Sequence, residues 1–413
     1  MDAQQVLPQR VRLFHVGPPK TGTTALQWSA AQRRTELLEA GVRYPGRLRN
    51  HRLAVAAFLD RPIGWVEADG DRVGAPAMRH WYQLLGEVEA EPWRRVWFGH
   101  EYAAQAGPDA VARFAEQLGP DLHVVITLRS FARMLPSMWQ EHLKGAGARG
   151  TFERWLRGML LPERPVEHAR VARHDHAALV ERWADRVGPD RVTVIAVNRR
   201  DPGLLFRSFE GLLDLPAGLL ESVPAVRANR SLTLAEIELL RRLNRLTRTH
   251  GLAWSTHERL VVRGAVDRVL ASSPGSGRLE LPAWAVPLAN REAERVAEAI
   301  AASGVRVVGD LADVAEPAAV PEQYRDHRRV EGVPMDVAVE SLAGMLAAAA
   351  GYEPDLTRTP EKVARQFVVH LRDDLSVARE VGWRRLAGAA AGRARSGLVG
   401  LGYAGLGWRR SLS

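Results

Sequence analysis

Short apolar runs alternate with longer amphipathic stretches along most of the chain. The apolar runs are rich in Val, Ile, Leu and Phe and have the length of strands buried on both faces. The stretches between them repeat their apolar residues at helical spacing. The strands are predicted over 11–16, 95–101, 123–128, 191–197 and 305–308, and the helices over 22–39, 50–60, 76–91, 108–118, 176–187, 202–213, 231–248, 257–271 and 285–303.

Strands that alternate with helices predict an α/β fold, in which a parallel sheet is covered by helices on both faces. We place this domain at residues 10–315. Residues 316–335 are rich in Pro, Ala and charged side chains and predict a linker. Two further helices, over 336–350 and 360–380, make residues 336–413 a helical C-terminal extension with a basic tail.

The composition is that of an ordinary water-soluble protein. Apolar residues make up 46% and charged residues 25% of the 413 residues. The chain has no cysteine, which excludes disulfides and thiolate metal sites. Its polar first residues lack the apolar region of a signal peptide, and no apolar run has the length of a membrane span. We therefore expect a cytoplasmic protein.

The net charge of +9 is concentrated at one end of the chain. Residues 381–413 hold six arginines and no acidic residue. A nucleic-acid-binding protein would place its basic residues on a face of the folded domain, so this distribution argues against nucleic acid as the partner. The arginines interleave with aromatic residues at Trp383, Tyr403 and Trp408. This mixture suits peripheral contact with an anionic membrane, and it also suits a disordered, solubilising end, which we favour slightly.

The segment Phe14–Thr24, with the sequence FHVGPPKTGTT, predicts a phosphate site. It reads as a strand, a tight turn and a helix start, and the free N–H groups of a helix N-terminus bind anions. Lys20 adds a mobile charge beside them, and the hydroxyls of Thr21, Thr23 and Thr24 add donors. A Walker A loop would place the lysine directly after its second glycine, whereas Lys20 precedes Gly22.

Two further observations strengthen the prediction of an anion site. Only three of the 57 basic residues are lysines, namely Lys20, Lys144 and Lys362, so an ammonium group inside the loop is conspicuous. Lys20, Glu101 and Arg129 each lie at or just past the end of a predicted strand, and the carboxyl ends of parallel strands share one edge of a sheet. Ser137 follows Arg129 by eight residues, so both can face the same cleft.

These motifs resemble those of sulfotransferases that use 3′-phosphoadenosine 5′-phosphosulfate (PAPS). The string PKTGTT is similar to their 5′-phosphosulfate loop, and the stretches 127–144 and 303–310 resemble actinobacterial sulfotransferase-like proteins. The resemblance covers about residues 10–315 and implies a sheet like that of P-loop NTPases. It further implies the residues that bind PAPS: Pro19, Lys20, Thr21, Gly22, Thr23 and Thr24 at the 5′-phosphosulfate, Arg129 and Ser137 at the 3′-phosphate, and Arg227 and Arg230 near the adenosine or the 3′-phosphate.

The resemblance also implies a catalytic base. In these enzymes a His or Glu near the end of a central strand takes the proton of the acceptor, and His100 and Glu101 hold that position. Glu101 matches the Ser-Ser-Glu pattern of carbohydrate sulfotransferases, although Gly99 and His100 replace the serines, which leaves both residues as candidates. The implied reaction is sulfuryl transfer to a hydroxyl or amine of a carbohydrate, glycolipid or small molecule, with catalytic Lys20 and no metal.

Several alternatives stay open from the sequence. A variant P-loop could serve a nucleotide phosphotransferase, or the fold could be an inactive binding scaffold. Glu101 could form a structural ion pair with Lys20 or Arg129. The spacing of His168, His174, Asp175 and His176 fits no metal-ligand pattern and favours a structural role, and Trp139 is expected in the core.

Overall fold

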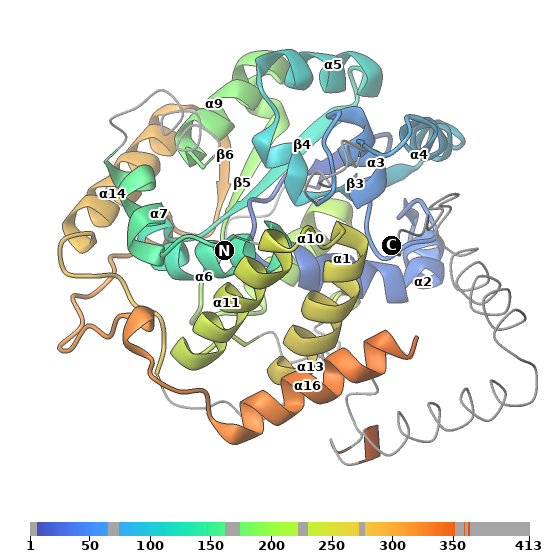
Figure 1. The fold of residues 1–413 in the computed structure, drawn as a ribbon. Helices are drawn as coiled ribbons and strands as arrows, with labels where there is room; N and C mark the ends of the chain where they lie inside the picture. The colour runs from blue at the N-terminus through green and yellow to red at the C-terminus, as the bar shows by residue number, and fades with distance from the viewer. Residues whose placement is uncertain are drawn as a thin grey trace, which may run out of the picture. The chain divides into compact units, whose positions relative to one another are not determined.

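The computed structural model describes residues 6–64, 74–146, 148–161, 174–221, 230–271 and 277–351, with 359, 362 and 363 (Figure 1). The contacts divide the chain into two compact units. Met1–Trp254 and Pro274–Gly332 form the first, which we call the sheet unit, and Ser255–Ser273 and Val333–Ser413 form the second, the helical unit. The segment Ser255–Ser273, which the sequence places in the large domain, thus groups with the C-terminal part of the chain.

A parallel sheet is the centre of the sheet unit, as predicted. Within the described residues it has six strands in the order β2-β3-β1-β4-β5-β6, and every pairing is parallel. Phe14 of the central strand β1 lies opposite Phe98 of β3 and Val124 of β4. The short strand β2 at one edge was not predicted. The strands are β1 (Arg12–His15), β2 (Val42–Arg43), β3 (Arg95–Gly99), β4 (Leu122–Leu128), β5 (Val192–Ala196) and β6 (Arg306–Val308).

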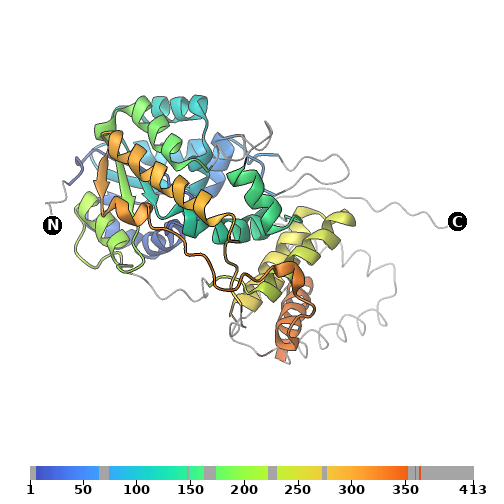
Figure 2. The same cartoon turned by 90° about the vertical axis from the view of Figure 1, so that its left-hand side faces the viewer.

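Helices lie on both sides of this sheet (Figures 1 and 2). The α-helices of the sheet unit are α1 (Thr23–Gln32), α2 (Arg34–Glu39), α3 (Arg52–Phe58), α4 (Arg79–Glu89), α5 (Pro108–Leu118), α6 (Phe131–Ala146), α7 (Phe152–Leu160), α9 (His176–Val187), α10 (Leu204–Leu213), α11 (Leu234–Thr249), α14 (Val286–Ala302) and α15 (Leu311–Val314). Short 3₁₀ turns are η1 (Glu101–Gln105), η2 (Pro189–Arg191) and η4 (His327–Arg329).

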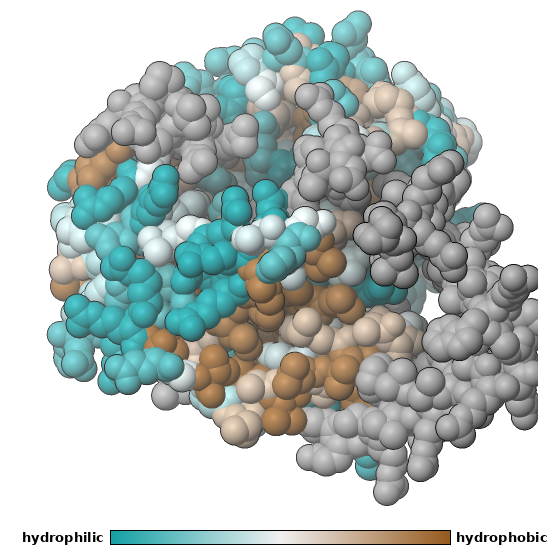
Figure 3. Space-filling view, viewed as in Figure 1, coloured by the Kyte–Doolittle hydropathy of each residue, from teal (hydrophilic) through white to brown (hydrophobic). Residues whose placement is uncertain are grey.

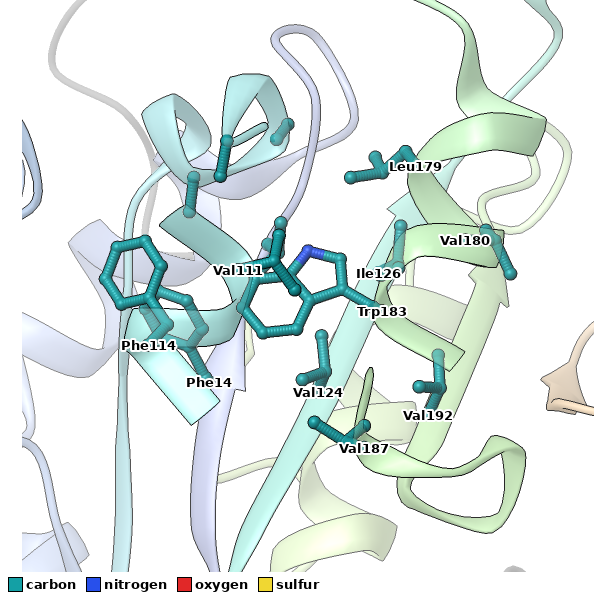
Figure 4. Packing of buried hydrophobic residues seen from close by; sticks show 14 of the residues in the cluster. Phe14, Val111, Phe114, Val124, Ile126, Leu179, Val180, Trp183, Val187 and Val192 are labelled. Atoms are coloured by element: carbon teal, nitrogen blue, oxygen red, sulfur yellow. The ribbon is translucent and has the colours of Figure 1, made fainter. Parts of the chain in front are cut away.

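The two faces of the sheet bury separate cores. On one face the indole of Trp183 on α9 packs among Val124, Val192 and Phe14 of the strands and Phe114 of α5 (Figure 4). On the other face α1 and α10 cover the sheet, and the buried side chains there include Leu26, Trp97, Val125, Ile195 and Phe209. Because the central strands are buried on both faces, their sequences are continuously apolar instead of alternating.

Two predicted helices differ in detail from the structure. The helix predicted over 22–39 breaks at Arg33 into α1 and α2. The helix predicted to begin at Ser231 begins later, because Thr233 is the N-cap and forms a capping box with Glu236. Trp139, expected in the core, is 1% exposed, which confirms that prediction.

The segment predicted as a linker is anchored to the sheet unit over much of its length. The side chain of Asn290 on α14 exchanges hydrogen bonds with the backbone of Ala318. His327 is buried, and its Nε2 accepts a hydrogen bond of 3.2 Å from the backbone N–H of Phe152. These side-chain contacts are long-range in sequence, so composition alone did not predict them.

In the helical unit, α16 (Met335–Ala349) packs against the π-helix η3 (Glu258–Val266), which lies between α12 (Trp254–His257) and α13 (Asp267–Ala271). The two backbones approach closely where Gly264 meets Gly344, since a Cβ on Gly264 would lie 2.9 Å from the Gly344 carbonyl oxygen. The exposed side of α16 carries Met335, Val339 and Leu342, and Figure 3 shows hydrophobic side chains over this helix. Apart from 362 and 363, the helix predicted over 360–380 and the basic tail lie outside the described residues.

Candidate active site

The predicted phosphate loop connects β1 to α1 and is built around internal hydroxyl groups. A Cβ on Gly17 would lie 2.6 Å from Thr23 Oγ1 and would clash with Thr127 of β4, so only glycine fits this position. The Thr21 hydroxyl donates to the Pro18 carbonyl at 2.8 Å and lies 2.8 Å from Thr127 Oγ1. Thr21 therefore stabilises the loop from inside, since its hydroxyl is engaged by Pro18 and Thr127.

The start of α1 has the features of an anion site. Gly22 is the N-cap, in a left-handed conformation with φ 92°, and no side chain caps the first N–H groups of α1. The first turn holds no acidic residue. The Ala25 and Leu26 N–H groups donate to the Gly22 carbonyl oxygen, so the N–H groups of Thr23 and Thr24 are the ones that precede the first intrahelical hydrogen bond. The Thr23 hydroxyl is buried and has no hydrogen-bond partner. An anion at this helix start would satisfy both sets of donors.

Lys20 lies in the turn before α1, and its ammonium group pairs with a residue that sequence reasoning missed. The backbone of Lys20 is left-handed, with φ 73°. Its Nζ lies 2.6 Å from Glu141 Oε1 of α6, and Lys144 also forms an ion pair with that oxygen. Burial alone would raise the pKa of Glu141, but the ammonium groups of Lys144 and Lys20 lower it to about 2. The carboxylate is therefore ionised at every physiological pH.

One face of α6 carries three of the polar residues that surround the loop. Ser137, Glu141 and Lys144 follow one another at i, i+4 and i+7, and this spacing places them on the same side of a helix. The contact of Glu141 with Lys20 shows that this side faces the phosphate loop. The helical spacing from Ser137 is the signal in the sequence that would have identified Glu141.

Glu101 follows the end of β3, where a glycine and a histidine fix the backbone. A Cβ on Gly99 would lie 2.8 Å from the His15 backbone nitrogen of β1, so the two strands approach too closely for a side chain. His51 Nδ1 lies 3.2 Å from the Gly99 carbonyl oxygen and its Nε2 lies 2.9 Å from that of Pro45. Glu101 is thereby presented as the half-buried first residue of η1.

The pKa of Glu101 is raised to about 7. Burial is the largest cause and the negative charge of Glu141 is the second, while Lys20, Arg61 and Arg52 act in the opposite direction. A carboxyl group with a pKa near neutrality can accept a proton and release it again at physiological pH. No ion pair of Glu101 with Lys20 or Arg129 occurs among the described ion pairs, in which Lys20 contacts Glu141.

His100 has a different environment from Glu101. Its Nδ1 accepts a hydrogen bond of 3.2 Å from the Tyr102 backbone N–H, so the neutral ring carries its proton on Nε2. Burial is the largest cause that holds the pKa of His100 well below its usual value, and Arg52 is the next. The ring is therefore neutral, and its acceptor nitrogen is already occupied.

Arg129 follows β4 and reaches the phosphate loop, as the position of its strand predicts. Its Nη1 donates to the Lys20 carbonyl oxygen at 3.4 Å. Burial, then the neighbouring guanidinium groups of Arg199 and Arg133, lower the pKa of Arg129. Arg199 comes three residues after β5. Because residues that follow the carboxyl ends of parallel strands lie together, its position after a predicted strand is the signal that would have identified it.

Of the two arginines predicted in the later basic segment, Arg230 belongs to the described residues, and it pairs with a glutamate. Arg227 lies outside them. Both terminal nitrogens of Arg230 donate to Glu236 at 2.8 Å, which ties this guanidinium to the capping box of α11. The chain just before α11 passes along α6, where the Leu232 N–H donates to Gln140 Oε1 at 2.8 Å.

The histidine cluster of the sequence has structural roles where it is described. Asp175 caps α9 by accepting from the Ala178 N–H at 3.0 Å and pairs with Arg295. The buried ring of His176 packs edge-on against Phe131. His168 lies outside the described residues. Within the described ranges, no group of three or more His, Asp or Glu side chains could hold a metal ion, and no helix has the length and apolar character needed to cross a membrane.

Comparisons with known proteins give one weak match. No protein-family model and no curated protein matches the sequence. Among solved structures, the chain is similar to a crystal structure of a sulfotransferase from Alicyclobacillus acidocaldarius, with 19% identity and a TM-score of 0.37 over 61% of this chain and 98% of the other. A similarity at this TM-score assigns neither fold nor activity, so both rest on the residues of this chain.

Proposed function

We propose that this protein is a PAPS-dependent sulfotransferase. It would transfer the sulfuryl group of PAPS to a hydroxyl or amine of a carbohydrate, glycolipid or small molecule. The observation that carries the proposal is the placement, at one edge of the sheet, of an anion-binding helix start, the ammonium of Lys20 and a carboxyl group with a pKa of about 7. The resemblance of the PKTGTT loop to the 5′-phosphosulfate loop of sulfotransferases supports it.

The donor would lie across the phosphate loop. The backbone N–H groups of 21–24 and the unpaired Thr23 hydroxyl would bind the 5′-phosphosulfate. Arg129, with Arg199 beside it, offers guanidinium groups for a 3′-phosphate, and Ser137 adds a hydroxyl from α6. A site with these groups prefers PAPS to ATP because ATP has no 3′-phosphate.

In the proposed reaction Glu101 removes the proton of the acceptor hydroxyl. The acceptor oxygen attacks sulfur and forms the new S–O bond, while the bond from sulfur to the bridging oxygen of the 5′-phosphate breaks. That oxygen keeps the electron pair, and the product is 3′,5′-ADP. Lys20 and the loop N–H groups stabilise the charge that develops there. We assign the base to Glu101 because the acceptor nitrogen of His100 is occupied by the Tyr102 N–H.

The two alternatives, a Mg-dependent phosphotransferase and an inactive scaffold, differ from this proposal in their products. The purified full chain is incubated with PAPS and a panel of sugars, glycolipids and phenols, and separately with Mg-ATP, and mass spectrometry follows the products. We expect formation of 3′,5′-ADP together with a sulfated acceptor. Phosphorylated products from Mg-ATP, with PAPS left intact, would overturn the proposal in favour of phosphotransfer.

A further inference from the structure

The carboxylate of Glu141 lies between two ammonium groups at the edge of the phosphate loop. Lys20 Nζ is 2.6 Å from Oε1, and Lys144, one helical turn after Glu141, pairs with the same oxygen. These are two of the three lysines in the whole chain. The three side chains are 16–37% exposed, so solvent weakens the ion pairs only in part.

In this arrangement the Glu141 carboxylate contacts the ammonium group that would neutralise the charge of the proposed donor. The Lys20 ammonium is the mobile cation of the loop, and its partner in the structure is Glu141. A phosphosulfate at the start of α1 would compete with the Glu141 carboxylate for that ammonium. If Lys20 turned to the donor, Lys144 would still neutralise Glu141 from its own helix.

We propose that Glu141 is a positioning residue that holds Lys20 until the donor binds and then yields it to the donor, with Lys144 as its permanent partner. This inference rests on the proposed function, because it concerns the same donor site. Because the Glu141 carboxylate occupies the Lys20 ammonium, it lowers the affinity of the site for anions in general. Only a ligand that also engages the helix start and Arg129 compensates for the loss of the Lys20–Glu141 pair.

The proposal predicts opposite effects for the two α6 residues. Glu141→Gln keeps the shape of the side chain and removes its charge, so 3′,5′-ADP should bind about tenfold tighter, which corresponds to about 1.4 kcal/mol. Lys144→Met leaves Glu141 with Lys20 as its remaining lysine partner, so 3′,5′-ADP should bind roughly threefold weaker or worse. Loss of structure would weaken binding in both variants and cannot produce tighter binding in one of them.

The double variant shows whether Lys144 acts through Glu141. In the Glu141→Gln background, Lys144→Met should have no further effect on the affinity, because the carboxylate that it neutralises is gone. A lysine that contacts the donor directly would weaken binding to the same extent in both backgrounds, and this result would overturn the role assigned to Lys144.

The experiment is calorimetric titration of the full chain with 3′,5′-ADP, with thermal melting to verify that each variant folds. Glu91→Gln is the matched control, because Glu91 also lies between two cationic side chains, Arg43 and Arg94. Glu91 precedes β3 and therefore lies at the amino ends of the strands, away from the proposed donor site at their carboxyl ends. This variant should leave the affinity unchanged. If Glu141→Gln does not fold, Glu141→Ala is the second removal of the charge.

The outcomes separate this inference from the proposed function. If the wild-type chain binds 3′,5′-ADP and Glu141→Gln binds it no more tightly, Glu141 does not compete for Lys20 and the inference is overturned alone. If the wild-type chain does not bind 3′,5′-ADP, the proposed function fails and the inference fails with it.

Discussion

Single residues of the site owe their chemistry to their surroundings. Glu101 and Glu141 are both glutamates near Lys20, yet burial and the charge of Glu141 raise the pKa of one to about 7, while two lysines lower that of the other to about 2. The pair thus divides into a group that can exchange a proton and a group that keeps its charge. Environments that give two neighbouring carboxyl groups such different pKa values are typical of catalytic sites.

The pKa of Glu101 predicts the pH dependence of the reaction. A base must be ionised to accept the proton, so the turnover should fall as the pH drops through about 7, with the slope of one titrating group. Glu101→Gln should lose most of the activity at every pH and keep its affinity for 3′,5′-ADP. His100→Gln keeps a polar side chain and should retain the acid limb near pH 7. A limb near pH 4 in the wild type would contradict the raised pKa of Glu101, and turnover close to the wild-type value in Glu101→Gln would contradict Glu101 as the base.

The folded-state pKa of Glu101 also predicts a pH dependence of stability. Because this pKa lies above the usual value of 4.5, the native state binds the proton more tightly than the unfolded chain does between pH 4.5 and about 7. The contribution of Glu101 to the free energy of unfolding therefore falls as the pH rises through that window. The change in melting temperature from pH 5 to pH 8 should be more negative for the wild type than for Glu101→Gln. An equal change in both proteins would mean that the pKa shift is absent.

Lys20 is the residue expected to stabilise the leaving phosphate. Lys20→Ala should lower the turnover by roughly 10²- to 10³-fold, the scale for removal of one preorganised charge stabiliser. Lys362→Ala removes an exposed lysine of the helical unit and should have no effect. The measurement is the rate of 3′,5′-ADP formation at saturating PAPS. A rate close to the wild-type value for Lys20→Ala would exclude the role.

At the scale of elements, the site is formed by the segments that leave the carboxyl ends of the strands. β1 leads into the phosphate loop, β3 into Glu101, β4 into Arg129 and α6, and β5 into Arg199. Parallel strands bring these turns to one edge although the residues are far apart in sequence. The helix α6 then adds its polar face, with Ser137 and Glu141, beside the loop.

The strand-end arginine is expected to select the 3′-phosphate. Arg129→Ala should weaken binding of 3′,5′-ADP by about 10- to 100-fold, the scale for a lost hydrogen bond to a charged group, and should change binding of 5′-AMP much less. Arg186→Ala, an exposed arginine in the last turn of α9 near the start of β5, is the control that should change neither. Titrations with both nucleotides measure the difference, and an equal loss for the two nucleotides would rule out selection at this position.

At the scale of the whole molecule, the sequence predicted the features that local patterns determine. Continuous apolar runs identified strands that are buried on both faces, and their ends identified Lys20, Glu101 and Arg129 at one edge. Contacts between distant segments had no comparable signal. The pairing of Lys20 with Glu141, the inward Thr21 hydroxyl and the anchoring of His327 against Phe152 each join residues more than a hundred positions apart. The grouping of 255–273 with α16 likewise depends on tertiary packing around Gly264 and Gly344.

The central claim is that this sheet edge binds the nucleotide part of PAPS. Thermal unfolding of the full chain with 3′,5′-ADP, compared with Mg-ATP, tests it most directly. A ligand at a hundred times its dissociation constant adds about 2.7 kcal/mol to the free energy of unfolding, so a true product should raise the melting temperature clearly. We predict this increase with 3′,5′-ADP, with or without Mg²⁺, and a smaller one with Mg-ATP. Stabilisation by Mg-ATP without any by 3′,5′-ADP would contradict the account.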